Sequence, residues 1–262
     1  MKQRIVTGLI GGIIFIGIVY LGNSWFSLLV LLLALGGLYE FLRMAKIPLF
    51  SMASLFSFIL MLGILLPNVA FASSMELSVG DVLLPVMLLL FIYSVWRKNQ
   101  FHIEHVALTI LGALYIGYGF TYMLATRNLP EHGLLLTFLV VFGIWATDTG
   151  AYFVGKAVGR RKLWPAISPN KTLEGSLGGL VLAVLVVALL NQLGGSFSFG
   201  QVLGIGLTIG IAGQLGDLVE SAIKRHFGVK DSGQILPGHG GVLDRFDSLL
   251  FVFPILHLSG MI

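Results

Sequence analysis

The chain contains no cysteine, and only 11% of its 262 residues are charged, while 56% are hydrophobic. The absence of cysteine excludes disulfide bonds and thiolate metal sites, although it does not identify the compartment. So little charge excludes an ordinary soluble domain, in which about a quarter of the residues are charged. Lys and Arg outnumber Asp and Glu by 16 to 12. Membrane topology accounts for this basic excess, so we expect no nucleic acid partner.

Long apolar runs make up much of the chain. Runs of about 17 to 22 apolar residues recur along the chain, and each is long enough to cross a bilayer. We therefore expect an all-α, polytopic integral membrane bundle of about nine transmembrane helices. The expected spans lie near residues 5–22, 25–41, 50–66, 80–96, 105–125, 133–155, 175–193, 200–221 and 246–261. Residues 1–100 show only generic membrane-helix character, and we expect the catalytic region at 101–262.

The distribution of Lys and Arg predicts the orientation of these spans. With nine spans, fifteen of the sixteen basic residues lie on one side of the membrane, and only Arg127 lies on the other. Basic residues concentrate in cytoplasmic loops. We therefore expect the N-terminus inside and the C-terminus outside a prokaryotic cytoplasmic membrane. The polar loops 156–174 and 222–245 then face the cytoplasm, where nucleotides are found.

Residues 216–247 interrupt the apolar pattern. They contain five of the twelve acidic residues and four of the sixteen basic ones. A membrane protein rarely gathers both charge signs at a helix end unless the site handles ions. Carboxylates suit divalent cations, and Lys and Arg suit phosphate. The candidate metal ligands are Asp217, Glu220, Asp244 and Asp247, and the candidate phosphate-binding residues are Lys224, Arg225, Lys230 and Arg245. A plain cytoplasmic loop would explain the basic residues but not the acids.

One face of the eighth expected span combines small and charged residues. Its members recur every three or four positions: Gly206, Gly210, Gly213, Asp217, Glu220 and Lys224. On an α-helix they stay within about 40° of one line. The glycines predict a close contact with another helix, and the two acids one turn apart predict a cation between them. A small-residue packing face that ends in interfacial charges is the alternative.

Two further polar features lie upstream. The segment 168–175, with Ser168, Asn170 and Lys171, opens the seventh span, and side chains at a helix start suit a phosphate. A capping box over residues 171–174 is the simpler alternative, and both can hold together. Asp148 lies inside the sixth span. Because an isolated charge there is costly, we expect it to be paired, protonated or facing a wet cavity.

These motifs resemble those of the CDP-diacylglycerol synthases, also called phosphatidate cytidylyltransferases. The blocks that carry the resemblance are Ser221-x-x-Lys224-Arg225, Lys230-Asp231, His239-Gly240-Gly241, Asp244-Arg245-x-Asp247, Ser168–Gly175 and Asp148–Tyr152. They cover the chain from about Trp145 to its C-terminus. The resemblance implies that CTP and phosphatidic acid, a membrane lipid, give CDP-diacylglycerol and pyrophosphate. It also implies a requirement for Mg²⁺, with a second cation as an option, and a homodimer.

The resemblance also implies roles for individual residues. We expect Asp217, Asp244, Asp247 and Lys224 to be catalytic. The expected substrate-binding residues are Ser168, Asn170, Lys171, Ser221, Arg225, Lys230, Asp231, His239, Gly240, Gly241, Arg245 and Asp148. Two related activities stay open: a CTP-dependent polyprenol or dolichol kinase, and a cytidylyltransferase for another lipid phosphate. An ion-coupled transporter is a third alternative, but the sequence shows no inverted repeat that would favour it.

Overall fold

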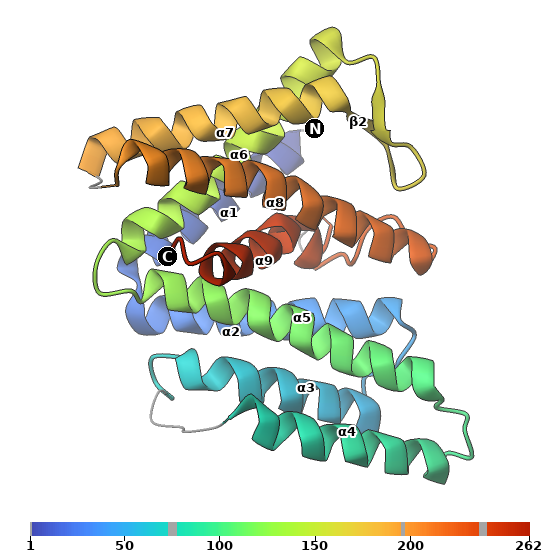
Figure 1. Cartoon of the computed structure of the whole chain (residues 1–262). Helices are drawn as coiled ribbons and strands as arrows, with labels where there is room; N and C mark the ends of the chain where they lie inside the picture. The colour runs from blue at the N-terminus through green and yellow to red at the C-terminus, as the bar shows by residue number, and fades with distance from the viewer. Residues whose placement is uncertain (1, 73–77, 195–196, 236–239) are drawn as a thin grey trace. The chain divides into compact units, whose positions relative to one another are not determined.

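The computed structural model describes residues 2–72, 78–194, 197–235 and 240–262, with side chains from Gly8 onward. Helices dominate this part of the chain (Figure 1). They are α1 (Lys2–Leu21), α2 (Asn23–Met44), α3 (Met52–Leu65), the 3₁₀ turn η1 (Leu66–Asn68), α4 (Val79–Trp96), α5 (Ile103–Arg127), α6 (Gly133–Val158), α7 (Leu173–Gly194), α8 (Phe199–His226) and α9 (Leu243–Leu258). Each predicted apolar range contains an α-helix, so the predicted all-α fold class is confirmed.

Six of the helices in the described residues are long and apolar enough to cross a membrane, namely α2, α4, α5, α6, α7 and α8. Large apolar side chains on them, such as Leu185 and Leu189 of α7, are exposed, which suits a helix facing lipid. The chain is therefore an integral membrane protein. At 16 residues, α9 is about 24 Å long, less than the hydrocarbon core of about 30 Å. The count of nine spans stays a prediction.

The chain divides into two compact units. Unit 1 comprises Met1–Ala125 and Asp231–Arg245, and unit 2 comprises Thr126–Lys230 and Phe246–Ile262. The polar segment that the sequence presents as continuous is thus shared between two units. Its described residues between 231 and 245 belong to the same unit as the N-terminal helices, to which the sequence gave no specific role. The functional division at residue 100 stays a prediction.

Unit 1 packs around α2. Phe26, Val30 and Leu38 are fully buried on this helix. A Cβ added to Gly112 of α5 would lie 2.5 Å from the ring of Phe41, so a small residue there lets α5 approach the aromatic ring. In the same unit, α3 and α4 lie side by side (Figure 1). The one acidic residue of α2, Glu40, is also fully buried in this unit.

Unit 2 is built on close helix contacts at glycines. A Cβ on Gly179 of α7 would lie 2.5 Å from the carbonyl oxygen of Thr147 in α6. On α8, Cβ atoms at Gly206 and Gly210 would lie 2.9 and 3.2 Å from Cα atoms of α7. The predicted close contact along the glycine face of α8 is therefore confirmed at these two positions, with α7 as the partner. Gly213 has only ordinary van der Waals surroundings.

A short β-hairpin replaces the loop expected before α7. Strands β1 (Lys162–Trp164) and β2 (Ser168–Thr172) pair antiparallel, with Lys162 opposite Thr172. The Oγ1 of Thr172 accepts a hydrogen bond from the backbone N–H of Gly175 at 3.1 Å and so caps α7. The carboxylate of Glu174 accepts from the backbone N–H groups of Arg160 and Arg161.

The predicted capping box over residues 171–174 is therefore only half right. The hydroxyl cap exists, but the glutamate that should bond back to the helix start bonds to the chain entering the hairpin. The reason is that β1 and β2 run antiparallel, which returns residues 160–161 to the first turn of α7. Glu174 thereby closes the base of the hairpin, and Lys171 is held on a strand instead of a free loop.

Candidate functional site in two polar clusters

The first polar cluster, in unit 2, begins with an ion pair between the hairpin and α8. The Nζ of Lys171, on β2, lies 2.6 Å from Oδ2 of Asp217, and both side chains are half-buried. The hydroxyl of Ser221, one turn further along α8, donates to Oδ1 of Asp217 at 3.3 Å. Asp217 is therefore paired through one oxygen and hydrogen-bonded through the other. The hairpin places Lys171 at this carboxylate.

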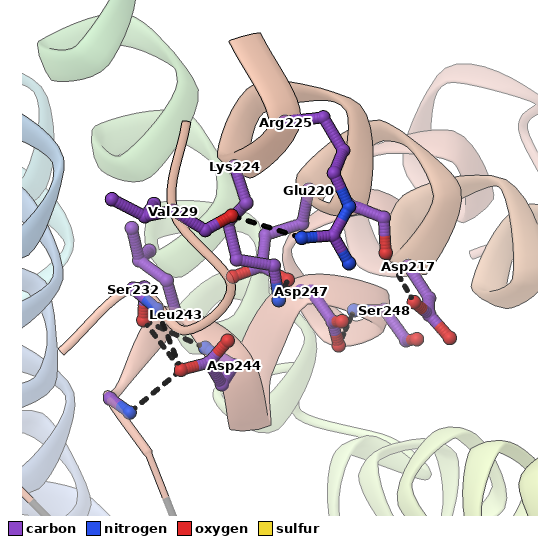
Figure 2. A network of polar contacts seen from close by, with 12 residues as sticks. Asp217, Glu220, Lys224, Arg225, Val229, Ser232, Leu243, Asp244, Asp247 and Ser248 are labelled. Carbon is purple, nitrogen blue, oxygen red and sulfur yellow. Dashed lines mark hydrogen bonds and ion pairs between the residues drawn. The ribbon is translucent and has the colours of Figure 1, made fainter. Parts of the chain in front are cut away.

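A second ion pair lies one turn further along α8. The Nζ of Lys224 is 2.6 Å from Oε2 of Glu220, and their side chains are only 11% and 2% exposed (Figure 2). The sequence predicted one cation between Asp217 and Glu220, whereas each acid has its own lysine partner. Although Lys224 lies near the end of α8, its side chain and its charge are buried against Glu220.

Arg225 follows Lys224 in the last turn of α8. It is exposed near the end of α8, and its Nη1 donates to the carbonyl oxygen of Val229 at 3.0 Å (Figure 2). This bond closes the turn after the helix. The guanidinium group keeps further donors toward solvent, so it is suited to meet a phosphate. Lys230, just beyond, is also exposed.

The third acid of the first cluster, Asp247, comes from α9. Its Oδ1 accepts from the backbone N–H of Ser248 at 2.6 Å, and the charges of Asp217, Asp148 and Lys224 act on it. Helix α9 reaches this position because α8 has a glycine there. A Cβ on Gly216 would lie 2.8 Å from the carbonyl oxygen of Asp247. The cluster thus draws carboxylates from two helices, α8 and α9.

The remaining predicted residues of unit 2 are more open. Asp148, on α6, is exposed, and its charge acts on Asp247. On the hairpin, Ser168 is half-buried and Asn170 is exposed. Their substrate-binding roles stay predictions.

The second polar cluster lies in unit 1 and is centred on Asp244. Its Oδ2 accepts three hydrogen bonds, from the backbone N–H of Ser232 at 2.9 Å, the hydroxyl of Ser232 at 2.9 Å and the backbone N–H of Gly241 at 2.8 Å. Figure 2 shows the bonds to Ser232. A metal ion at this oxygen would compete with all three donors. The structure therefore gives Asp244 a role in holding its own loop, and its metal role stays a prediction.

The glycines of this loop make room for carboxylates. Gly240 has a φ of +84°, a backbone conformation that other residues rarely adopt. A Cβ on Gly241 would strike the carboxylate of Glu40 and the hydroxyl of Ser232. Asp231 and Arg245 are exposed, and His239 lies outside the described residues. The predicted approach of this backbone to a nucleotide stays a prediction.

Sequence reasoning missed Glu40 of α2, which lies in this second cluster. It is fully buried and accepts hydrogen bonds from Ser232, Val242 and Leu243. A signal for it was present, since an ionisable residue inside an apolar span is by default a candidate functional residue. Because residues 1–100 otherwise show only generic membrane-helix character, the sequence pattern assigned Glu40 no role.

The oxygen donors of unit 2 fit a cation that arrives with its substrate. Among the described residues, no group of three or more His, Asp or Glu side chains is arranged to hold a metal ion by itself. Mg²⁺ commonly uses only one or two carboxylates and completes its shell with water and substrate phosphates. Asp217 and Asp247, with the hydroxyl of Ser221, can supply such a partial set.

Together, the membrane-spanning helices and these paired acids and lysines define an integral membrane protein with a charged site suited to a phosphate-bearing substrate. The chain belongs to the cytidylyltransferase family, whose model matches residues 2–262. It is 48% identical over 260 residues to a phosphatidate cytidylyltransferase of Bacillus subtilis, covering 98% of this chain and 96% of that protein. Relatives of the same name from Staphylococcus haemolyticus and Staphylococcus aureus are 44% and 42% identical, each covering 98% of both chains.

Proposed function

We propose that the protein transfers the cytidylyl group of CTP to phosphatidate, which gives CDP-diacylglycerol and pyrophosphate. The similarity to phosphatidate cytidylyltransferases over nearly the whole length of both chains carries this proposal. The arrangement of acids and lysines in unit 2 supports it, because a transfer between two phosphates needs positive charge and a cation more than it needs a base. The product is an activated lipid for phospholipid biosynthesis.

The reaction is a displacement at phosphorus. An oxygen of the phosphatidate phosphate forms a bond to the α-phosphorus of CTP, and the bond from that phosphorus to the β-phosphate oxygen breaks. The electron pair leaves with pyrophosphate. The attacking oxygen is already anionic, so no side chain has to remove a proton. The protein therefore has to bring two anions together and stabilise the leaving group, by position and by charge.

The lysines of unit 2 are the groups suited to this task. Lys171 and Lys224 are paired with Asp217 and Glu220, and a triphosphate entering the cluster offers both ammonium groups a new anionic partner. The exposed Arg225 can bind a phosphate through two parallel hydrogen bonds. We assign these three residues to the phosphates of CTP. Lys230 and Arg245 are further candidates.

We propose Mg²⁺ as the cofactor, with Asp217 and Asp247 as its protein ligands and Glu220 and Asp244 as further candidates. When bound, Mg²⁺ neutralises charge on the transferring and leaving phosphates. A second cation is a separate proposal, tested by metal titration of activity. A homodimer is also proposed, and the molar mass of the purified protein in detergent tests it. A monomer at working concentrations would contradict the dimer.

The activity is tested with purified full-length protein in detergent, phosphatidate and Mg²⁺. With CTP labelled on the α-phosphate, we expect label in the lipid and unlabelled pyrophosphate in solution. A lipid kinase would instead transfer label only from the γ-phosphate. The assay is therefore repeated with CTP labelled on the γ-phosphate. If neither labelled CTP gives labelled lipid with any detergent or divalent ion, both the cytidylyltransferase and the kinase activity are refuted.

We further propose that the N-terminus and the polar loops face the cytoplasm, on the strength of the Lys and Arg distribution. A reporter fused after Ile262 is expected to behave as extracytoplasmic, and one inserted within residues 228–238 as cytoplasmic. The same side for both reporters would remove the last predicted span and contradict this orientation.

A further inference from the structure

Glu40 is the buried acid around which the loop of unit 1 is arranged. It lies on α2 with none of its surface exposed. Its Oε1 accepts from the backbone N–H of Val242 at 2.9 Å, and its Oε2 accepts from that of Leu243 at 3.0 Å. The hydroxyl of Ser232 lies 3.0 Å from Oε2 and shares its one proton between this oxygen and Oδ2 of Asp244. One carboxylate thus binds the loop at two places, ten residues apart in sequence.

These bonds satisfy the start of α9. The first N–H groups of a helix have no partner within the helix. Here those of Val242 and Leu243 donate to Glu40, and that of Asp244 donates to the hydroxyl of Ser232 at 3.3 Å. The next one, at Arg245, donates to the carbonyl oxygen of Val242. A negative charge at this end is also favoured by the helix dipole.

The loop backbone is shaped to admit this carboxylate. A Cβ added at Gly233 or at Gly241 would strike an oxygen of Glu40. Both glycines belong to the segment that carries the predicted substrate-binding residues, so the loop closes around Glu40 from two sides. An alanine at either position would have to push the carboxylate out of its bonds.

A hydrophobic side chain would fill this place at lower cost than a buried carboxylate. It could not, however, fix the direction of two successive N–H groups. The carboxylate does so, and α9 begins there and carries both Asp244 and Asp247. Directional control of this helix start is what an acid adds over an apolar contact.

We propose that Glu40 is a positioning residue for the transferase reaction. Its carboxylate holds residues 231–235, residues 240–242 and the first turn of α9 in the conformation that catalysis requires, without touching substrate. This role rests on the proposed function, because the loop matters only if it takes part in that reaction. It assigns a specific task to the N-terminal helices.

The test compares three single variants of the full-length protein: Glu40→Gln, Ser232→Ala and the control Ser57→Ala. Ser57 is also fully buried in unit 1, but its hydroxyl donates to the carbonyl of Thr109, far from the loop. Each variant is measured for melting temperature, for kcat and KM with CTP, and for hydrogen exchange of the peptide covering 231–245. Exchange reports on the loop even if the reaction proves to be a different one.

We expect Glu40→Gln to speed exchange in 231–245 and to lower kcat by about 100-fold, the scale of a misplacement of about 1 Å in a catalytic site. Ser232→Ala should change both in the same direction by less, and Ser57→Ala should lower only the melting temperature. Unchanged exchange and kcat in folded Glu40→Gln would overturn the proposal. If that variant does not fold, Ser232→Ala decides by the same two readouts. Faster exchange with unchanged kcat would also overturn it, whereas no activity in the unmodified protein refutes the proposed function instead.

Discussion

The two polar clusters use carboxylates in opposite ways. In unit 1, Glu40 and Asp244 accept hydrogen bonds from backbone N–H groups and from the hydroxyl of Ser232. In unit 2, Asp217 and Glu220 are paired with lysine ammonium groups. The first pair of acids is held by neutral donors, most of which belong to the backbone. The second is held by the charges of lysine side chains.

This difference separates acids that fix the conformation of a loop from acids whose partners can change. Backbone N–H groups cannot leave without unfolding the loop, so the acids of unit 1 fix a conformation. The half-buried Lys171 can turn from Asp217 to a phosphate at little structural cost, and the acid it leaves can then bind a cation. The Lys171–Asp217 pair is therefore suited to a site that changes partners when substrate arrives, whereas the buried Lys224 can leave Glu220 only if a phosphate takes the place of the carboxylate.

The largest effect on activity is expected from Asp217→Asn. The amide keeps the size of the side chain and can still meet Ser221, but it loses the charge that pairs with Lys171 and that a cation would need. We expect turnover to fall by about 10²- to 10³-fold, the usual cost of removing one electrostatic contributor. Because an ion pair is also lost, the melting temperature should fall modestly and not rise.

Turnover and melting temperature are measured on the same preparations, with Glu131→Gln as a control that removes an exposed charge elsewhere in unit 2. The control should match the unmodified protein in both. Near-normal turnover in folded Asp217→Asn would make this acid purely structural and would remove the contrast between the two clusters.

The largest effect on stability is expected from Glu220→Gln. It leaves the ammonium group of Lys224, only 11% exposed, without its partner charge. Breaking a buried pair on one side costs about 3–5 kcal/mol, so the melting temperature should drop strongly. Replacing both residues, Glu220→Leu with Lys224→Met, should recover much of the stability.

The double variant separates stability from catalysis. If Lys224 binds a phosphate of CTP, the double variant stays inactive although it is folded and stable. If the double variant regains activity along with stability, the Glu220–Lys224 pair is only a structural element of α8. In that case only Lys171 changes its partner from a carboxylate to a phosphate when substrate binds.

Local pattern was enough for the helices and for part of the site. The apolar runs predicted every helix range, and the spacing of Gly206 and Gly210 predicted a close helix contact that α7 makes. The spacing also predicted that Asp217, Glu220 and Lys224 share one face of α8. Their partners were not predicted, because Lys171 reaches Asp217 from a hairpin whose strands are too short to show alternation in the sequence.

The role of Glu40 lay beyond sequence pattern for a related reason. Its bonds go to backbone N–H groups about two hundred positions away, and every residue but proline has such a group. Nothing in the type of Val242 or Leu243 marks them as its partners. An acid in an apolar span signals that a partner exists, but only the fold identifies it.

The smallest effect is expected from Arg225→Ala, which contrasts with its buried neighbour Lys224. Arg225 is exposed, and its hydrogen bond to the carbonyl of Val229 closes a surface turn. Surface substitutions of this kind usually leave stability nearly unchanged, so the melting temperature should stay close to that of the unmodified protein. If the guanidinium binds CTP equally before and during the transfer, KM for CTP rises several-fold while kcat is retained. Added salt should narrow the difference between variant and unmodified protein, since it screens an exposed charge. A lower kcat with unchanged KM would instead place Arg225 at the transferring phosphate, and a large loss of stability would place it with the structural residues.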